Sequence, residues 1–267
     1  MKTDTFSHDG VVFQYDLCLE GEKQVVLQHG LTDYALCWGD LVNDLCHQDC
    51  NIAMMDARGH GRSGKPGTGY GLETMTGDLM AFIEHIKVEH PIAIGHSMGG
   101  SIVAHAIGKH PDRFRAAVLI DPVFTEHRIL DWQEQIQGRK TAHRELQSKS
   151  HAEITAYTRK KHPLWNEKYV QTYVQSKLYA SDKIFSIMQD IDKSWKEDLE
   201  KAVCPILLIT AEKEKGAIIS PETTLWIKQT YPNIQHLHVT GVGHSPHREN
   251  YPLVFERISE FIDKQYR

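Results

Sequence analysis

A serine set between two glycines is the part of this sequence that most directly predicts chemistry. Residues 95–99 read Gly-His-Ser-Met-Gly, with an apolar run at 91–94 before them and a helical pattern after them. In a tight turn from a strand to a helix, the central serine takes a strained conformation that lifts its hydroxyl above the sheet edge. The flanking glycines leave space where a Cβ would meet the neighbouring strand or helix. The pattern therefore predicts Ser97 as a nucleophile.

Three other segments follow predicted strands and carry the groups that such a serine needs. Residues 28–33 (Gln-His-Gly-Leu-Thr-Asp) contain a glycine that lets the backbone turn and leaves the Leu31 N–H free to donate. Residues 210–216 form an acidic loop, and residues 241–245 (Gly-Val-Gly-His-Ser) place His244 on a glycine-rich loop. Serine, acid and histidine in this chain order predict a catalytic triad.

The rest of the chain alternates buried strands with amphipathic helices, which is typical of a mostly parallel sheet covered by helices. Two runs around the turn at 8–10 predict an antiparallel opening hairpin. Apolar runs predict strands at 24–27, 52–55, 92–94, 117–120, 206–209 and 237–239. Apolar spacings of three and four predict helices at 34–46, 73–86, 98–109, 221–229 and 251–264.

The strand pattern disappears between residues 124 and 199, where the sequence is polar, helical and rich in aromatic residues. We expect this stretch, called the cap segment below, to be a helical insertion in a core made of residues 1–123 and 200–267. Its aromatic side chains predict a covered, largely apolar substrate pocket. The expected pocket residues are Trp38, Phe124, Trp132, Trp165, Phe185 and Met188.

Over nearly its full length the chain resembles α/β-hydrolase-fold serine hydrolases with a helical cap. The resemblance rests on His29-Gly30, residues 56–63 (Asp-Ala-Arg-Gly-His-Gly-Arg-Ser), residues 95–100 and Gly243-His244-Ser245. It implies an eight-stranded, mostly parallel sheet with helices on both faces and an inserted cap. It also implies Ser97 as nucleophile, His244 as general base and then acid, and oxyanion-hole amides from Leu31 and Met98.

The acid of the triad has three candidates. Glu214 is preferred because its offset from the strand-ending Ala211 matches the spacing of the family, although an aspartate is usual there. Glu212 lies on the same loop, and Asp121 follows the strand at 117–120, a position that some relatives use. Asp121 precedes Pro122, so a turn at the entrance of the cap segment is its competing explanation.

These residues predict hydrolysis of a carboxylic ester or lactone, including a bulky or macrocyclic one, through an acyl-enzyme and without a cofactor. Amide, thioester and carbon–carbon bond hydrolysis use the same triad and remain alternatives, as does cofactor-free haloperoxidase activity. A non-catalytic small-molecule receptor on this fold is the alternative from another class.

Composition excludes several partners. A formal charge of −5 and a pI near 6.4 give no basic footprint for nucleic acid. No apolar run is long enough for a bilayer, and the seventeen histidines form no metal-binding motif, so we expect neither a membrane nor a metal partner. We expect a cytoplasmic monomer or homodimer whose five cysteines are reduced thiols, with pairing of Cys46 and Cys50, or metal binding by them, as the alternative.

Overall fold

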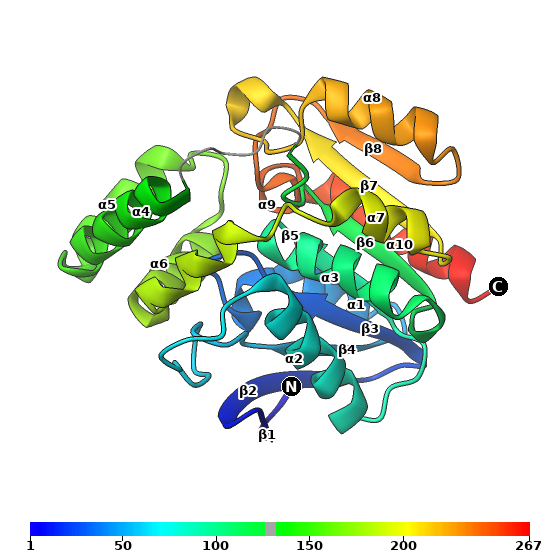
Figure 1. Cartoon of the computed structure of the whole chain (residues 1–267), viewed down its shortest axis with the longest axis horizontal. Coiled ribbons are helices and arrows are strands. Elements are labelled where there is room, and N and C mark those ends of the chain that lie inside the picture. Colours follow the sequence, from blue (N-terminus) through cyan, green and yellow to red (C-terminus); the bar gives the residue numbers. More distant parts are fainter. Residues whose placement is uncertain (126–131) are drawn as a thin grey trace.

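One eight-stranded sheet forms the centre of the computed structural model, which describes residues 1–125 and 132–267 (Figure 1). The strand order is β1-β2-β4-β3-β5-β6-β7-β8. The β1/β2 and β2/β4 pairs are antiparallel, and all other neighbours are parallel. This confirms the predicted hairpin and the mostly parallel α/β-hydrolase sheet. The strands are β1 (Lys2–His8), β2 (Val11–Leu19), β3 (Lys23–Gln28), β4 (Cys50–Met55), β5 (Ile92–His96), β6 (Ala116–Ile120), β7 (Ile206–Ala211) and β8 (Gln235–Val239).

The central strands are buried on both faces, which explains their nearly continuous apolar sequences. On β5, Ala93 faces one core cluster, whereas Ile92 and Ile94 face the other. The first cluster is covered by α2 (Leu72–His85), α3 (Met98–Lys109), α7 (Trp195–Lys201) and α8 (Pro221–Thr230). The second is covered by α1 (Asp40–Cys46) and α10 (Tyr251–Gln265). The predicted helices are therefore confirmed, with the short 3₁₀ helix η1 (Ala35–Trp38) separated from α1 at Gly39.

The described part of the cap segment is helical, as predicted. It contains α4 (Trp132–Gln147), α5 (His151–Lys161), α6 (Glu167–Tyr179) and the 3₁₀ helix η3 (Asp182–Gln189). Figure 1 shows α4, α5 and α6 grouped together to one side of the sheet layers. The predicted boundary at residue 199 falls inside α7, which packs so closely on α3 that a Cβ at Gly108 would lie 2.6 Å from the Asp198 Cα. Helix α7 therefore packs with the core helices.

The cysteines differ from the expectation of reduced thiols. Cys18 on β2 and Cys46 on α1 form a disulfide, with their Cα atoms 6.5 Å apart. The sequence prediction is wrong for this pair because α1 packs against the sheet face that carries Cys18, a contact that spacing along the chain does not reveal. Cys37, Cys50 and Cys204 are free. Among the described helices, none combines the length and the apolar character needed to cross a bilayer.

Candidate active site

Ser97 occupies the sharp turn between β5 and α3. Its φ of 54° is in a region that residues with a Cβ rarely adopt, which is the strain expected at this turn. The two flanking glycines are sterically required. A Cβ at Gly95 would lie 2.2 Å from the Gly99 carbonyl oxygen, and a Cβ at Gly99 would lie 2.0 Å from that of Gln28. The close contacts predicted from the Gly-x-Ser-x-Gly pattern are present.

His244 joins Ser97 to a carboxylate. Its Nε2 is 2.9 Å from Ser97 Oγ, and its Nδ1 is 2.6 Å from Asp121 Oδ2. A carboxylate only accepts, so Nδ1–H donates to Asp121 and leaves Nε2 to accept from the serine hydroxyl. His96 helps to hold the backbone of His244, because its Nε2–H donates to the His244 carbonyl oxygen at 2.9 Å. Burial lowers the pKa of His96 well below its ordinary value, which leaves its ring neutral.

Asp121 is held where it can orient the histidine. It is fully buried at the end of β6, and its carboxylate accepts from the backbone amides of Ile218 at 2.8 Å and Ile219 at 3.1 Å. Its φ of 39° is strained, like that of Ser97. Such strain is common where a fold positions functional groups. The turn predicted before Pro122 is thus present and also carries the carboxylate that contacts His244.

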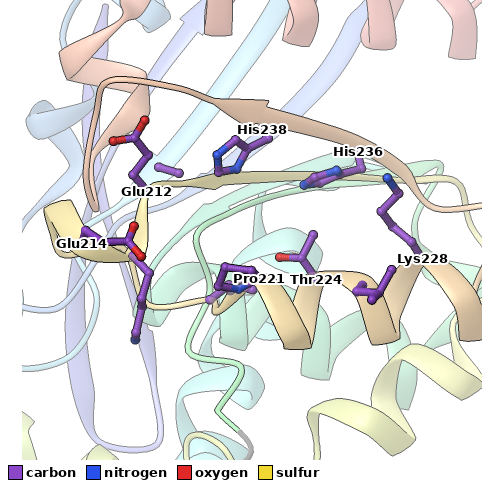
Figure 2. A pocket seen from close by; sticks show the side chains of 11 residues that line it. Glu212, Glu214, Pro221, Thr224, Lys228, His236 and His238 are labelled. Atoms are coloured by element: carbon purple, nitrogen blue, oxygen red, sulfur yellow. The ribbon is translucent and has the colours of Figure 1, made fainter.

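The structure does not place Glu214 against His244, which corrects the preferred assignment of the acid. Glu214 is exposed on the 3₁₀ helix η4 (Lys213–Lys215), and Glu212 bonds the Gly241 amide at 2.8 Å. Both glutamates line a separate hollow of about 340 Å³. Figure 2 shows them there together with His236 and His238 from β8. The loop after β7 directs its glutamates away from the triad, while its next residues donate amides to Asp121.

Leu31 and Met98 lie beside Ser97 in one cavity of about 900 Å³. The Met98 amide is at the first position of α3, where a helix offers no acceptor. The Leu31 amide bonds no acceptor among the described residues. Both N–H groups are therefore available to an oxyanion, as the sequence predicts.

The cavity contains only some of the expected pocket residues. Trp165, Phe185 and Met188 line it. Trp38 does not, because it is buried in the core and packs on His247, and Phe124 is stacked on Trp195 with ring centroids 4.9 Å apart. The side chain of Trp132 lies outside the part of the structure that is described. Aromatic composition alone could not separate core packing from cavity lining.

A buried ion cluster on the cavity wall was missed from the sequence. Asp33 pairs with Lys177 at 3.4 Å and with Arg248 at 2.7 Å. The two cations hold the pKa of Asp33 well below its ordinary value, although burial opposes them, and burial lowers the pKa of Lys177 to about 8. The sequence did contain a signal for a buried lysine, because Lys177 follows Tyr169 and Val170 at helical spacing on the buried face of α6.

Lys177 also connects the cap segment to the loop expected to bind the oxyanion. Its Nζ donates to the Thr32 carbonyl oxygen at 3.1 Å and to the Thr32 Oγ1. Thr32 directly follows Leu31 and has a φ of 64°. Helix α6 thereby helps to hold the Leu31 loop in position. Within residues 1–125 and 132–267, no group of three or more His, Cys, Asp or Glu side chains could hold a metal ion.

The sheet order, the strained serine turn and the Ser97–His244–Asp121 contacts define an α/β-hydrolase fold with a triad geometry. Residues 20–250 match the family described as "Serine aminopeptidase, S33", so the chain belongs to this family of α/β-hydrolases.

Similar proteins include hydrolases and peroxidases. The 2-(acetamidomethylene)succinate hydrolase of Mesorhizobium japonicum is 25% identical over 88% of this chain and 86% of its own. A crystal structure of E-2-(acetamidomethylene)succinate hydrolase covers 98% of this chain and 99% of its own, with a TM-score of 0.82 and 19% identity, and shows the same fold. The non-heme chloroperoxidase of Streptomyces lividans is 32% identical over 46% of this chain. The chain spans 45% of that relative's length and 35% of a phage haloperoxidase, well under two thirds of either. Solved esterases are among the other proteins with this fold.

Proposed function

We propose that the protein is a serine hydrolase that cleaves a carboxylic ester through an acyl-enzyme on Ser97. One observation carries the proposal: a continuous hydrogen-bond chain runs from the Ser97 hydroxyl through His244 to the buried carboxylate of Asp121. Such a chain activates a weak nucleophile, because the ring accepts the serine proton and the carboxylate stabilises the resulting imidazolium.

The proposed reaction has two halves. In the first, His244 Nε2 takes the Ser97 proton, the alkoxide attacks the ester carbonyl, and the Leu31 and Met98 amides bind the oxyanion. His244 then protonates the leaving alcohol, and an acyl-serine remains. In the second, the same ring activates water, which attacks the acyl group, and Ser97 recovers its proton as the acid leaves. All groups that these steps require lie at one cavity.

We propose residues 124–199 as the cap that covers this cavity. Trp165, Phe185 and Met188 of this segment line the cavity, which has room for a medium-sized acyl or alcohol group. A lactone would place both groups in one ring and is included in the proposed substrates. Amide hydrolysis is the second candidate, because the matching family is described as a serine aminopeptidase and a relative's name specifies hydrolysis of an acetamido compound.

The test is the reaction of the protein with a neutral fluorophosphonate and with a panel of esters, lactones and amides. Wild-type protein should be labelled at Ser97 and should hydrolyse esters. Ser97→Ala should lose labelling and about 10⁶ in kcat, since the members of a triad act as a unit. Ser259→Ala, on α10, is the matched control and should behave as wild type. An unlabelled wild-type protein, or retention of about a tenth of turnover by Ser97→Ala, would contradict the proposal.

A further inference from the structure

The charge around the cavity differs in sign from that of the chain. The whole sequence has 30 basic and 35 acidic residues. Among the residues that the structure describes, in contrast, the cavity is lined by five basic side chains and two acidic ones, Asp33 and Glu249. The basic residues are Arg139, Lys161, Lys177, Lys215 and Arg248. Positive charge is therefore concentrated at the site of reaction in a protein that is acidic overall, and a cleft with such walls attracts anions.

Both carboxylates are already occupied by the protein itself. Glu249 accepts from the backbone amides of Gly243 at 2.8 Å and Ser245 at 3.1 Å, which fixes it on the His244 loop. Asp33 is shared between Lys177 and Arg248. Neither acid pairs with Arg139 or Lys161, so these two side chains are not explained as partners of the acids in the lining.

The buried cluster of Asp33, Lys177 and Arg248 contains two cations for one anion. The side chains of all three are nearly inaccessible, with at most 5% of each exposed. Arg248 donates to Asp33 through Nη2 and lies over the Trp165 ring, whereas its enclosed Nε has no hydrogen-bond partner among the described residues. An uncompensated positive charge in such surroundings is costly and is stabilised by an anion that enters the cavity.

Arg139 on α4 and Lys161 on α5 also line the cavity. Both are exposed, and neither has a carboxylate within ion-pair distance in the described part of the chain. The Lys161 Nζ lies 5.8 Å from the centroid of the Tyr157 ring, which is a loose contact. Two unpaired cations at one cavity can bind a carboxylate by charge-assisted hydrogen bonds.

We propose that the substrate carries a carboxylate remote from the bond that is cleaved, and that Arg139 and Lys161 bind this carboxylate. The buried cluster adds a positive field at the same cavity. This inference rests on the proposed function, because it names the substrate class of the same site. It revises the apolar substrate expected from the sequence. Trp165 and Met188 contact the carbon chain of the substrate, while Arg139 and Lys161 recognise its charged end.

The test measures how fast a neutral fluorophosphonate labels Ser97, so it needs no ester that the enzyme turns over. Adipate should slow labelling by competing for the cavity, whereas adipamide, which has the same length without charge, should not. The ionic strength is matched with sodium chloride. A charge-assisted contact is worth enough to make adipate protect about tenfold better than adipamide.

Variants of Arg139 and Lys161 test whether these two side chains cause the protection by adipate. Arg139→Gln and Lys161→Gln should each lower protection by adipate about tenfold. Lys140→Gln and Lys160→Gln remove the same charge one residue away, outside the lining, and should keep it. Equal protection by adipate and adipamide, absence of protection by both, or equal losses in all four variants would overturn the inference. Failure of Ser97 to react at all would instead contradict the proposed function.

Discussion

Replacing Asp121 by asparagine tests the least predictable member of the proposed triad. The amide keeps the shape of the carboxylate but removes the charge that faces the His244 Nδ1 at 2.6 Å. A similar change in a serine-protease triad costs about 10⁴ in kcat, which corresponds to about 5 kcal/mol in the barrier. We expect Asp121→Asn to lose activity by about this factor on any ester that wild type hydrolyses.

The surroundings of Asp121 add an effect on stability. Its two oxygens accept from His244 and from the amides of Ile218 and Ile219. An asparagine has one acceptor oxygen, so either orientation leaves one buried amide hydrogen without a partner. This costs about 1–3 kcal/mol in the free energy of unfolding, which urea denaturation followed by circular dichroism would measure.

Glu214→Gln is the matched control, because Glu214 is exposed and lies at the separate hollow. A surface change of this kind should alter kcat/KM by no more than about twofold. The assay is steady-state hydrolysis at saturating and limiting ester, on protein whose fold is verified by its melting temperature. Near-wild-type turnover by Asp121→Asn, together with a large loss of turnover by Glu214→Gln, would refute the reasoning. The acid of the triad would then be Glu214, on the loop after β7.

Three further outcomes are expected. Gly99→Ala should destabilise the fold by more than about 3 kcal/mol, because its Cβ would lie 2.0 Å from the Gln28 carbonyl oxygen. Gly77→Ala on α2 has open space around the new Cβ and should stabilise the fold by about 0.5–1 kcal/mol. Urea denaturation measures both changes. Burial lowers the pKa of Lys177 from its ordinary 10.5 to about 8. Between about pH 8 and 10.5 the folded state therefore binds fewer protons than the unfolded chain, so the free energy of unfolding should rise with pH. Lys177→Met should remove this rise, and an unchanged slope in the variant would contradict the prediction. EDTA should leave ester hydrolysis unchanged, and a loss restored by zinc would show that a metal takes part.

The sequence predicts the fold and two of the three residues of the proposed triad, Ser97 and His244, because their signals are local. The strands are apolar runs buried on both faces, and the glycines around Ser97 and His244 mark turns that no other residue would allow. The acid is different. Both β6 and β7 lie between β5 and β8 in the sheet, so an acid at the end of either strand satisfies the chain order. Only the amides of Ile218 and Ile219 select Asp121, and they come from a segment almost a hundred residues away.

The residues that line the cavity could be predicted only in part, because their positions depend on contacts between distant segments. Aromatic composition indicates that the cap segment covers a cavity, but composition does not show whether a given ring faces the core or the cavity. Phe124 is thus in the core, while Trp165 of the same segment lines the cavity. The ion cluster joins Asp33, Lys177 and Arg248, which are far apart in the chain, so its net charge becomes apparent only when these side chains are brought together.

The hydrogen bond from Lys177 to Thr32 limits which helical insertions could replace the present one. A helical insertion between β6 and β7 would appear to be a module that evolution or an engineer replaces to change specificity. Here α6 supplies Lys177, whose Nζ donates to the carbonyl oxygen of Thr32, the residue after Leu31. A chimera with a foreign insertion would lose this support unless the new helix brought a donor to the same oxygen. Selection for new substrates is therefore expected to change the insertion and the loop after β3 together.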